Sequence, residues 1–303
     1  MIVMMKFNKK PFKFMLFLLS MFVFDCVAQQ DTLRKLNYPQ GYKEELNIVY
    51  TEVNGWQGKM DLYLPPATGK TPLVINIHGG GWNHGTRQGS IGGLNPFLKK
   101  GYAIANLSYR LTPTATAPAA VEDVRSALLF LLSHADQYNL DKAKIVVMGS
   151  SAGGHLALMC GLLGNNHLFD RGSFKGGDIK IAAIIDRYGI TDVWDWAHGP
   201  HKTSSSALRW LGDRQNDQAF ANSVSPLFYV DEHSAPVFIV HGDADPVVPY
   251  EHSVMLHNKL VSKGVKTAFI TVPGGLHGNF AVEKGKELNV QMMNFLKELS
   301  LHK

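Results

Sequence analysis

The sequence has very little cysteine. Its 303 residues include two cysteines, Cys26 and Cys160, so a dense framework of disulfides is excluded. Cys160 lies in the apolar stretch 155–163, a setting that predicts a buried and unreactive thiol. Stability must therefore come from an apolar core, and the 45% of apolar residues suffice for one large core or two small ones.

A surplus of charge is also missing from most of the chain. The formal net charge is +5, but four lysines and one aspartate fall within the first 28 residues. Removing these from the 30 basic and 25 acidic residues leaves 26 and 24, so the rest of the chain is nearly neutral. A neutral body without a basic patch argues against nucleic acid as a partner.

Motifs for common cofactors are absent as well. The chain contains no G-x-x-x-x-G-K-S/T phosphate loop, no H-E-x-x-H helix and no cysteine pairs for zinc. We therefore expect a protein that needs neither a metal nor a cofactor.

The N-terminal apolar run is too short to span a bilayer comfortably. Residues 14–24 form a run of eleven, broken only by Ser20, whereas a transmembrane helix needs about 20 residues. Four lysines precede the run and the small residues Cys26 and Ala28 follow it, which is typical of a secretory signal cleaved after Ala28. We expect residues 1–28 to be a signal peptide and residues 29–303 to be a secreted or periplasmic domain without stable membrane insertion. An uncleaved anchor and a lipoprotein carrying its lipid on Cys26 are the alternatives.

Hydrophobic patterning alternates between strand-like and helix-like segments. Strands are predicted at residues 46–53, 60–64, 73–78, 103–109, 145–148, 181–188, 237–241 and 267–272. Helices are predicted at residues 119–137, 152–163, 250–262 and 283–301. This alternation predicts a mostly parallel, eight-stranded sheet with helices on both faces and an antiparallel start. Residues 191–228 fit neither pattern, and a long irregular segment in a compact domain predicts a small lid or binding loop.

The sharpest motif is Gly149-Ser150-Ser151-Ala152-Gly153, which lies between a predicted strand and a predicted helix. It matches the G-x-S-x-G elbow, in which the middle serine occupies a strained turn and the glycines avoid clashes with the neighbouring strand and helix. Ser151 is therefore the candidate nucleophile. An ordinary Gly/Ser turn is the alternative, which the strand-to-helix context disfavours.

Three consecutive glycines follow another predicted strand, in His78-Gly79-Gly80-Gly81-Trp82. Such glycines allow backbone N–H groups to face a reacting carbonyl, whose oxyanion needs about two donors. The predicted donors are the N–H groups of Gly79, Gly80 and Ala152. A flexible loop without this role is the alternative.

A serine nucleophile needs a histidine base and a carboxylate that orients the base. His277 lies in a glycine-rich loop after the last predicted strand, whereas the other downstream histidines lie in a predicted helix or at the chain end. His277 is therefore the predicted base. Two acids, Asp243 and Asp245, follow the preceding strand, and the residues alone leave both open.

Four motifs together resemble the α/β-hydrolase superfamily: HGGGW (78–82), GSSAGG (149–154), HGDADPVVP (241–249) and GGLHG (274–278). Over residues 45–300 the chain is most similar to the esterase and lipase group with an HGGGW loop, which includes bacterial acetylxylan and feruloyl esterases. The resemblance implies an α/β-hydrolase fold, a Ser151-His277-Asp245 triad and two-step acyl transfer without a cofactor.

The resemblance also implies two structural roles. Arg110 is expected to pair with Asp123 and to fix the loop between them. His155, on the helix after the elbow, is expected to pack in the core.

Four tryptophans are the predicted substrate-binding residues. Trp82 lies beside the glycine loop, and Trp194, Trp196 and Trp210 lie in the lid segment. Their rings could stack on sugars or apolar groups over the nucleophile, or they could pack the lid onto the body. By resemblance, the substrate is a small-molecule ester or a short-acyl or feruloyl ester of a plant polysaccharide. An amide hydrolase and a non-catalytic binding protein on the same fold are the alternatives, and no feature indicates an oligomeric state.

Overall fold

The computed structural model describes residues 36–66, 69–112, 114–172 and 177–301. The predicted signal peptide, residues 1–28, and Cys26 lie outside these residues. The described chain from residue 36 onward belongs to one compact unit. No helix in this part of the chain is long and apolar enough to cross a membrane.

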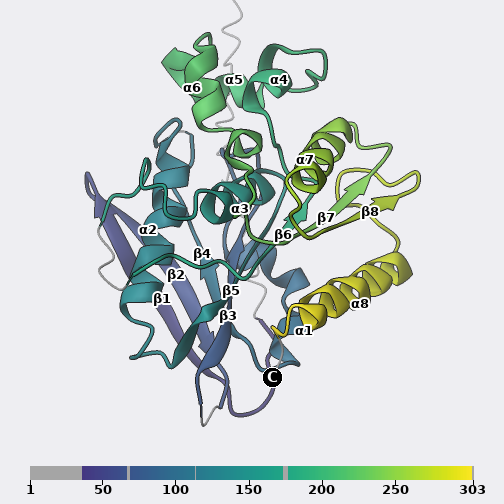
Figure 1. The fold of residues 1–303 in the computed structure, drawn as a ribbon. Helices are drawn as coiled ribbons and strands as arrows, with labels where there is room; N and C mark the ends of the chain where they lie inside the picture. Colours follow the sequence, from purple (N-terminus) through teal and green to yellow (C-terminus); the bar gives the residue numbers. More distant parts are fainter. Residues whose placement is uncertain (1–35, 67–68, 113, 173–176, 302–303) are drawn as a thin grey trace, which may run out of the picture. The chain divides into compact units, whose positions relative to one another are not determined.

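One sheet of eight strands runs through the described residues (Figure 1). The strands stand in the order β1-β2-β4-β3-β5-β6-β7-β8. The pairs β1–β2 and β2–β4 are antiparallel and the others are parallel, so the predicted architecture is confirmed. The strands are β1 (Lys43–Val53), β2 (Trp56–Leu64), β3 (Thr71–Ile77), β4 (Ala103–Leu107), β5 (Leu140–Ser150), β6 (Ala183–Arg187), β7 (Val237–Gly242) and β8 (Thr267–Val272).

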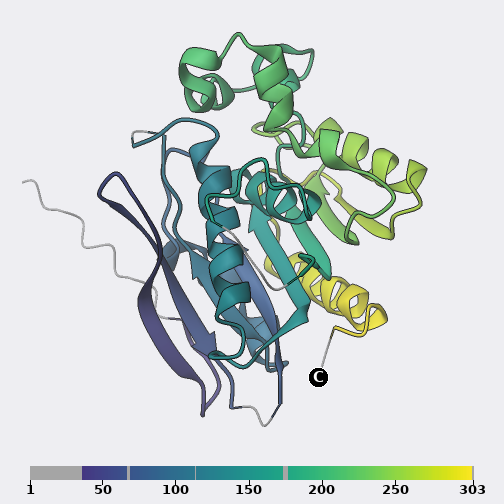
Figure 2. The ribbon, with the colours of Figure 1, turned by 60° about the vertical axis from the view of Figure 1, so that its left-hand side comes forward.

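Side chains alternate between two apolar cores, one on each face of the sheet. On β3, Leu73 and Ile75 enter the larger core and Val74 enters the smaller one, as the two-residue period of a strand requires. Helices α2 (Ala119–Ser133), α3 (Ala152–Leu162) and α7 (Glu251–Ser262) cover the larger core. Helices α1 (Asn95–Leu98) and α8 (Val282–Glu298) cover the opposite face (Figure 1 and Figure 2).

The parallel strands bring the four motifs to one edge of the sheet. The segments 78–82, 149–154, 241–249 and 274–278 lie at or just beyond the carboxyl ends of β3, β5, β7 and β8. Parallel neighbours end on the same side, and ligands of open α/β sheets bind beyond these ends. The fold therefore gathers residues that are far apart in the sequence.

The expectation that residues 191–228 are irregular is wrong. This segment holds three short helices, α4 (Val193–His198), α5 (Ser206–Leu211) and α6 (Gln218–Ser223), which lie together at the top of Figure 1. The carboxylate of Asp192 accepts the N–H of Asp195 at 3.0 Å and caps α4. Each helix has six residues, too few to leave a helical period in the sequence. We keep the name lid for residues 191–228.

Element boundaries differ where the apolar pattern is interrupted. Strand β5 begins at Leu140, five residues before the predicted start. Its first half holds Asp141, Lys142 and Lys144, which interrupt the apolar run that the prediction followed. Helix α2 ends at Ser133, four residues before the predicted end. The four-residue helix α1 had no signal strong enough to predict it.

Two predicted structural roles are confirmed. Cys160 is a free, fully buried cysteine, and burial raises the pKa of its thiol to about 12. Arg110 lies 2.8 Å from a carboxylate oxygen of Asp123, which is itself fully buried. The backbone N–H of Arg110 donates to the same carboxylate at 2.7 Å, so this pair fixes the chain after β4 against α2.

Candidate active site

Ser151 stands in a sharp turn between β5 and α3. Its φ of 57° and ψ of −124° are rare for a residue with a side chain, and such strain is typical of a nucleophile elbow. A Cβ atom on Gly149 would lie 2.1 Å from the carbonyl oxygen of Gly153, and one on Gly153 would lie 2.2 Å from that of Ile77. Both positions therefore require glycine, because a backbone oxygen lies where a side chain would begin.

A chain of hydrogen bonds links Ser151, His277 and Asp245. Nε2 of His277 lies 2.8 Å from Oγ of Ser151, and Nδ1 lies 2.6 Å from Oδ2 of Asp245. The side chain of Asp245 is fully buried, whereas that of His277 is 21% exposed. The structure thus brings together three residues that are 126 and 32 positions apart in the sequence.

The proton positions follow from the charge of Asp245. Burial by itself raises the pKa of this carboxyl, but hydrogen bonds from His241, His277 and the N–H of Val247 outweigh burial and hold the pKa well below its usual range. Asp245 is therefore an anion and accepts the Nδ1–H of His277. Nε2 of a neutral His277 then has a free lone pair that can take the hydroxyl proton of Ser151.

Asp243 occupies a different place. Its Oδ1 accepts the backbone N–H of Gly274 at 2.6 Å, so this carboxylate fixes the loop that precedes His277. The carboxylate beside the imidazole is that of Asp245. The geometry thus separates two acids that the residues alone left open.

His241, the first residue of the segment 241–249, is a neighbour of the site that the sequence analysis missed. Its buried Nε2 lies 3.0 Å from the carbonyl oxygen of Val248 and 3.2 Å from Oδ2 of Asp245. Both neighbours are acceptors, so Nε2 carries the proton, and Nδ1 accepts from Oγ of Ser253 at 2.7 Å. His241 therefore contacts the carboxylate of Asp245 from inside the protein.

Two of the predicted oxyanion donors lie against the elbow. A Cβ atom on Gly79 would be 2.7 Å from the carbonyl oxygen of Ser150 and 3.5 Å from Cβ of Ser151. Ala152 is the first residue of α3, where N–H groups have no partner within the helix. Both positions therefore adjoin Ser151, Ala152 in the chain and Gly79 across the fold.

The third predicted donor, Gly80, lies in a tight turn. Its φ is +117°, and its carbonyl oxygen accepts the N–H groups of Asn83 and His84 at 3.0 and 3.1 Å. The hydroxyl of Tyr109 donates to the carbonyl oxygen of His78 at 3.0 Å and holds the start of the loop. Residues 78–82, the oxyanion loop from here on, are thus fixed from both ends.

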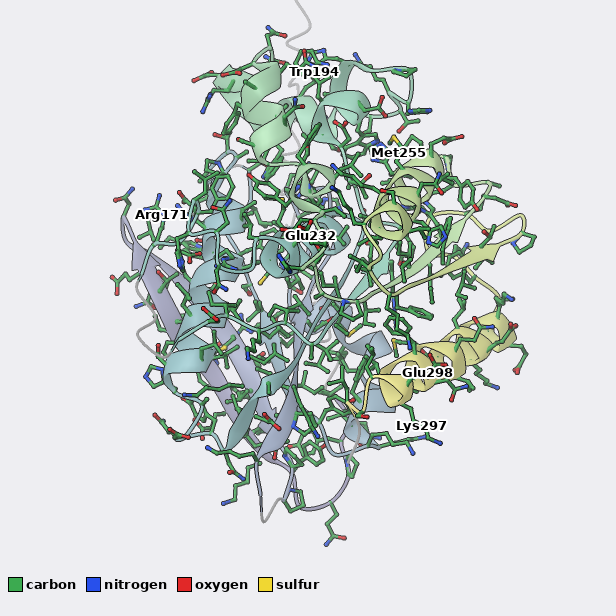
Figure 3. All side chains as sticks on the ribbon, viewed as in Figure 1. Arg171, Trp194, Glu232, Met255, Lys297 and Glu298 are labelled. Carbon is green, nitrogen blue, oxygen red and sulfur yellow. The ribbon has the colours of Figure 1, made fainter. Side chains whose placement is uncertain are left out.

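Three of the four predicted substrate-binding tryptophans are buried, so that part of the prediction is wrong. Trp82, Trp196 and Trp210 are 0%, 2% and 1% exposed. The ring of Trp82 stacks on Trp210 at 4.3 Å and meets Trp196 edge-on at 5.7 Å. These residues pack the lid onto the oxyanion loop. Trp194 is partly exposed on α4 and lies against His198 (Figure 3).

His155 joins this aromatic group and packs in the core, as expected. Its Nδ1 accepts the indole N–H of Trp82 at 3.3 Å, and its Nε2 donates to the carbonyl oxygen of Val224 at 2.7 Å. Burial lowers the pKa of His155 to about 4, against an opposing effect of the bond to Val224. The residue is neutral at physiological pH.

Among the described residues, no group of three or more His, Cys, Asp or Glu side chains is arranged to hold a metal ion.

Comparisons with known proteins find similar chains that are described as esterases. The probable carboxylic ester hydrolase LipM of Mycobacterium tuberculosis is 29% identical over 229 residues, which cover 73% of this chain and 52% of that protein. A truncated carbohydrate esterase from gut microbiota is 28% identical, with a TM-score of 0.76 over 88% of this chain and 99% of that one. An acetyl ester-xyloside bifunctional hydrolase from Caldicellulosiruptor lactoaceticus shares the fold at 22% identity, with a TM-score of 0.74 over 88% of this chain and 99% of that one.

The sheet order, the helices on both faces and these relatives define an α/β-hydrolase of the esterase group. The family model BD-FAE matches residues 60–260, and the chain belongs to that family. The chain spans about half the length of the first curated relatives that it matches.

Proposed function

We propose that this protein hydrolyses carboxylic esters through an acyl-enzyme on Ser151, with His277 as general base and Asp245 as its orienting carboxylate. The observation that carries the proposal is the unbroken series of hydrogen bonds from Oγ of Ser151 through the imidazole to Oδ2 of Asp245. A serine in a strained strand-to-helix turn beside free backbone N–H groups is the arrangement that acyl transfer needs.

The reaction proceeds in two steps. Nε2 of His277 takes the hydroxyl proton while Oγ of Ser151 attacks the ester carbonyl, and the oxyanion binds the N–H groups of Ala152 and of Gly79 or Gly80. Collapse of this intermediate breaks the ester bond, and the imidazolium returns its proton to the leaving alcohol. His277 then activates a water that hydrolyses the acyl-enzyme, and Asp245 stays ionised throughout.

The substrate class in the proposal is a short-acyl or feruloyl ester of a plant polysaccharide. It is supported by the relatives described as a carbohydrate esterase and as an acetyl ester-xyloside hydrolase. The export signal expected in residues 1–28 agrees with a polymeric substrate outside the cell, and the proposed location is periplasmic or extracellular. Release of acetate or ferulate from acetylated or feruloylated xylan tests this part.

Two neighbouring serines provide the decisive test of catalysis. The purified full chain should hydrolyse 4-nitrophenyl acetate faster than the butyrate and octanoate. Ser151→Ala should lower kcat by a factor of about 10³ or more, because the nucleophile is lost. Ser150→Ala is the matched control, since Ser150 is the adjacent residue of the same motif and its side chain has no role in the proposed reaction. Equal activity in both variants would refute the assignment.

A further inference from the structure

A cavity of about 210 Å³ lies on the α8 face of the sheet, beside the loop that carries His277. Its walls come from the end of β6, the segment 278–282, helix α8 and Gly92-Gly93 of the 3-10 helix η1 (Gln88–Gly93). By the same measure one water needs about 10–15 Å³. The cavity therefore has room for a chemical group of several non-hydrogen atoms.

Arg187, at the end of β6, is the one charged side chain among the described residues that line this cavity. One guanidinium nitrogen lies 3.7 Å from the sulfur of Met292, and a thioether sulfur is a weak acceptor. A Cβ atom on Gly93 would lie 2.6 Å from another guanidinium nitrogen, so glycine at this position makes room for the guanidinium.

Three other arginines show what this chain does with inward-facing guanidinium groups. Arg87, Arg110 and Arg125 each contact an aspartate, at 2.8, 2.8 and 2.6 Å. Among the described carboxylates, none lies within ion-pair distance of Arg187. Burial lowers the pKa of Arg187, but a guanidinium stays charged in proteins. Arg187 is half-buried, so its guanidinium is open to an anion that reaches the cavity.

The cavity is in contact with the reacting groups through Tyr188 and Gly278. The ring of Tyr188 meets the imidazole of His277 edge-on at 4.8 Å, and Gly278 follows His277 in the chain. A Cβ atom on Gly278 would lie 2.2 Å from the hydroxyl of Tyr188, so the two walls touch. The cavity therefore lies beside His277, with the ring of Tyr188 in contact with both.

We propose that this cavity binds a carboxylate carried by the substrate, which the guanidinium of Arg187 receives through paired hydrogen bonds. The planar fork of a guanidinium matches the two oxygens of a carboxylate, and Phe280 and Leu288 add apolar walls beside it. The inference rests on the proposed ester hydrolysis and narrows its substrate to esters with an anionic group near the scissile bond. That group belongs either to the acyl part or to the alcohol part, such as a uronic acid.

Two matched pairs of esters distinguish these sources. 4-Nitrophenyl hemiglutarate carries the carboxylate on the acyl side and is compared with 4-nitrophenyl valerate. 4-Acetoxybenzoate carries the carboxylate on the alcohol side and is compared with its methyl ester. In each pair the measured quantity is the ratio of kcat/KM for the anionic ester to kcat/KM for the neutral ester.

The test variant is Arg187→Met, which removes the charge and keeps most of the side-chain length. The ratio should fall at least tenfold in one pair, and the pair that responds identifies the side that carries the carboxylate. Arg187→Lys keeps the charge but loses the planar pair of donors, so it should give an intermediate ratio. It replaces Arg187→Met in the test if that variant fails to fold. Arg171→Met is the control for charge loss, because this arginine lies far to the left of α8 in Figure 3 and pairs with Glu122.

Binding provides a readout that does not need turnover. Titration of glutarate into the Ser151→Ala protein should give a measurable Kd, and adding Arg187→Met should weaken binding at least tenfold. Ratios unchanged by both Arg187 variants in both pairs, with glutarate binding also unchanged, would overturn the inference and leave ester hydrolysis standing. Failure of the wild-type chain to hydrolyse any of the four esters overturns the proposed function, and the glutarate titration then still decides whether Arg187 binds a carboxylate.

Discussion

Acidification should destabilise this protein in part through a single buried imidazole, that of His155. In the folded state its Nδ1 faces the indole N–H of Trp82 and its Nε2 already donates to Val224, so a second ring proton has no acceptor. Burial lowers the pKa of His155 from its ordinary value of 6.5 to about 4. Because the folded pKa is depressed, the unfolded chain binds more protons between these values, and stability falls as the pH drops from about 6.5 toward 4.

The expected loss can be worked out for a change from pH 7.5 to pH 5. For pKa values of 6.5 unfolded and about 4 folded, His155 accounts for a loss of about 2 kcal/mol in unfolding free energy. His155→Gln replaces the imidazole by a group that can donate and accept but does not titrate. Its absolute stability is lower, but its loss between the two pH values should be about 2 kcal/mol smaller than that of the wild type.

Urea unfolding at both pH values, followed by circular dichroism, measures this difference. His78, whose pKa burial also lowers, titrates in both proteins and cancels in the comparison. His252 cancels nearly, because burial is the largest cause of its lowered pKa and His155 the smallest. If the wild type and His155→Gln lose the same free energy, the imidazole is not neutral in the fold and the reasoning fails.

Three further predictions concern the site and the lid. Asp245→Asn should lower kcat by about 10⁴-fold because the base loses its orientation. Asp243→Asn keeps an acceptor for the N–H of Gly274 and should retain most of the activity. The reverse order of effects would contradict the assignment. Gly79→Ala places a Cβ atom 2.7 Å from a carbonyl oxygen and should lower kcat about 10²-fold or more by displacing an oxyanion donor. The same close approach should also lower stability in urea unfolding, and unchanged kcat would count against this donor. Trp210→Ala removes a ring that is 1% exposed and should lower the free energy of unfolding in urea by about 3–5 kcal/mol. A loss below about 1 kcal/mol would show that the lid does not depend on this contact.

Features that depend on neighbours along the chain could be predicted from the sequence. Strand β8 has the predicted bounds, 267–272, because a short apolar run between turn residues is a local signal. The turn at Ser151 was predicted for the same reason, since the glycines that permit it lie within two residues. His277 was identified by its place after the last strand, which the fold brings to Oγ of Ser151.

Features that depend on contacts across the fold could not be predicted from the residues alone. Asp243 and Asp245 are equivalent in local sequence, and the resemblance to a family had to choose between them. His241 sits in a recognised motif, but only the folded chain shows its Nε2 beside a carboxylate. Trp82 and Trp210 are 128 positions apart, and no local signal distinguishes a ring that faces a partner from one that faces a ligand.

The stacking of Trp82 on Trp210 constrains how this protein can be redesigned or diverge. The oxyanion loop meets the lid through rings on both sides, so the lid forms part of the support of the catalytic backbone. A lid grafted from another esterase would place a different side chain opposite Trp82 and shift the amides that it steadies. An exchange of the lid would therefore change specificity successfully only under one of two conditions. Either the new lid keeps an aromatic residue opposite Trp82, or residue 82 is substituted to fit the new lid.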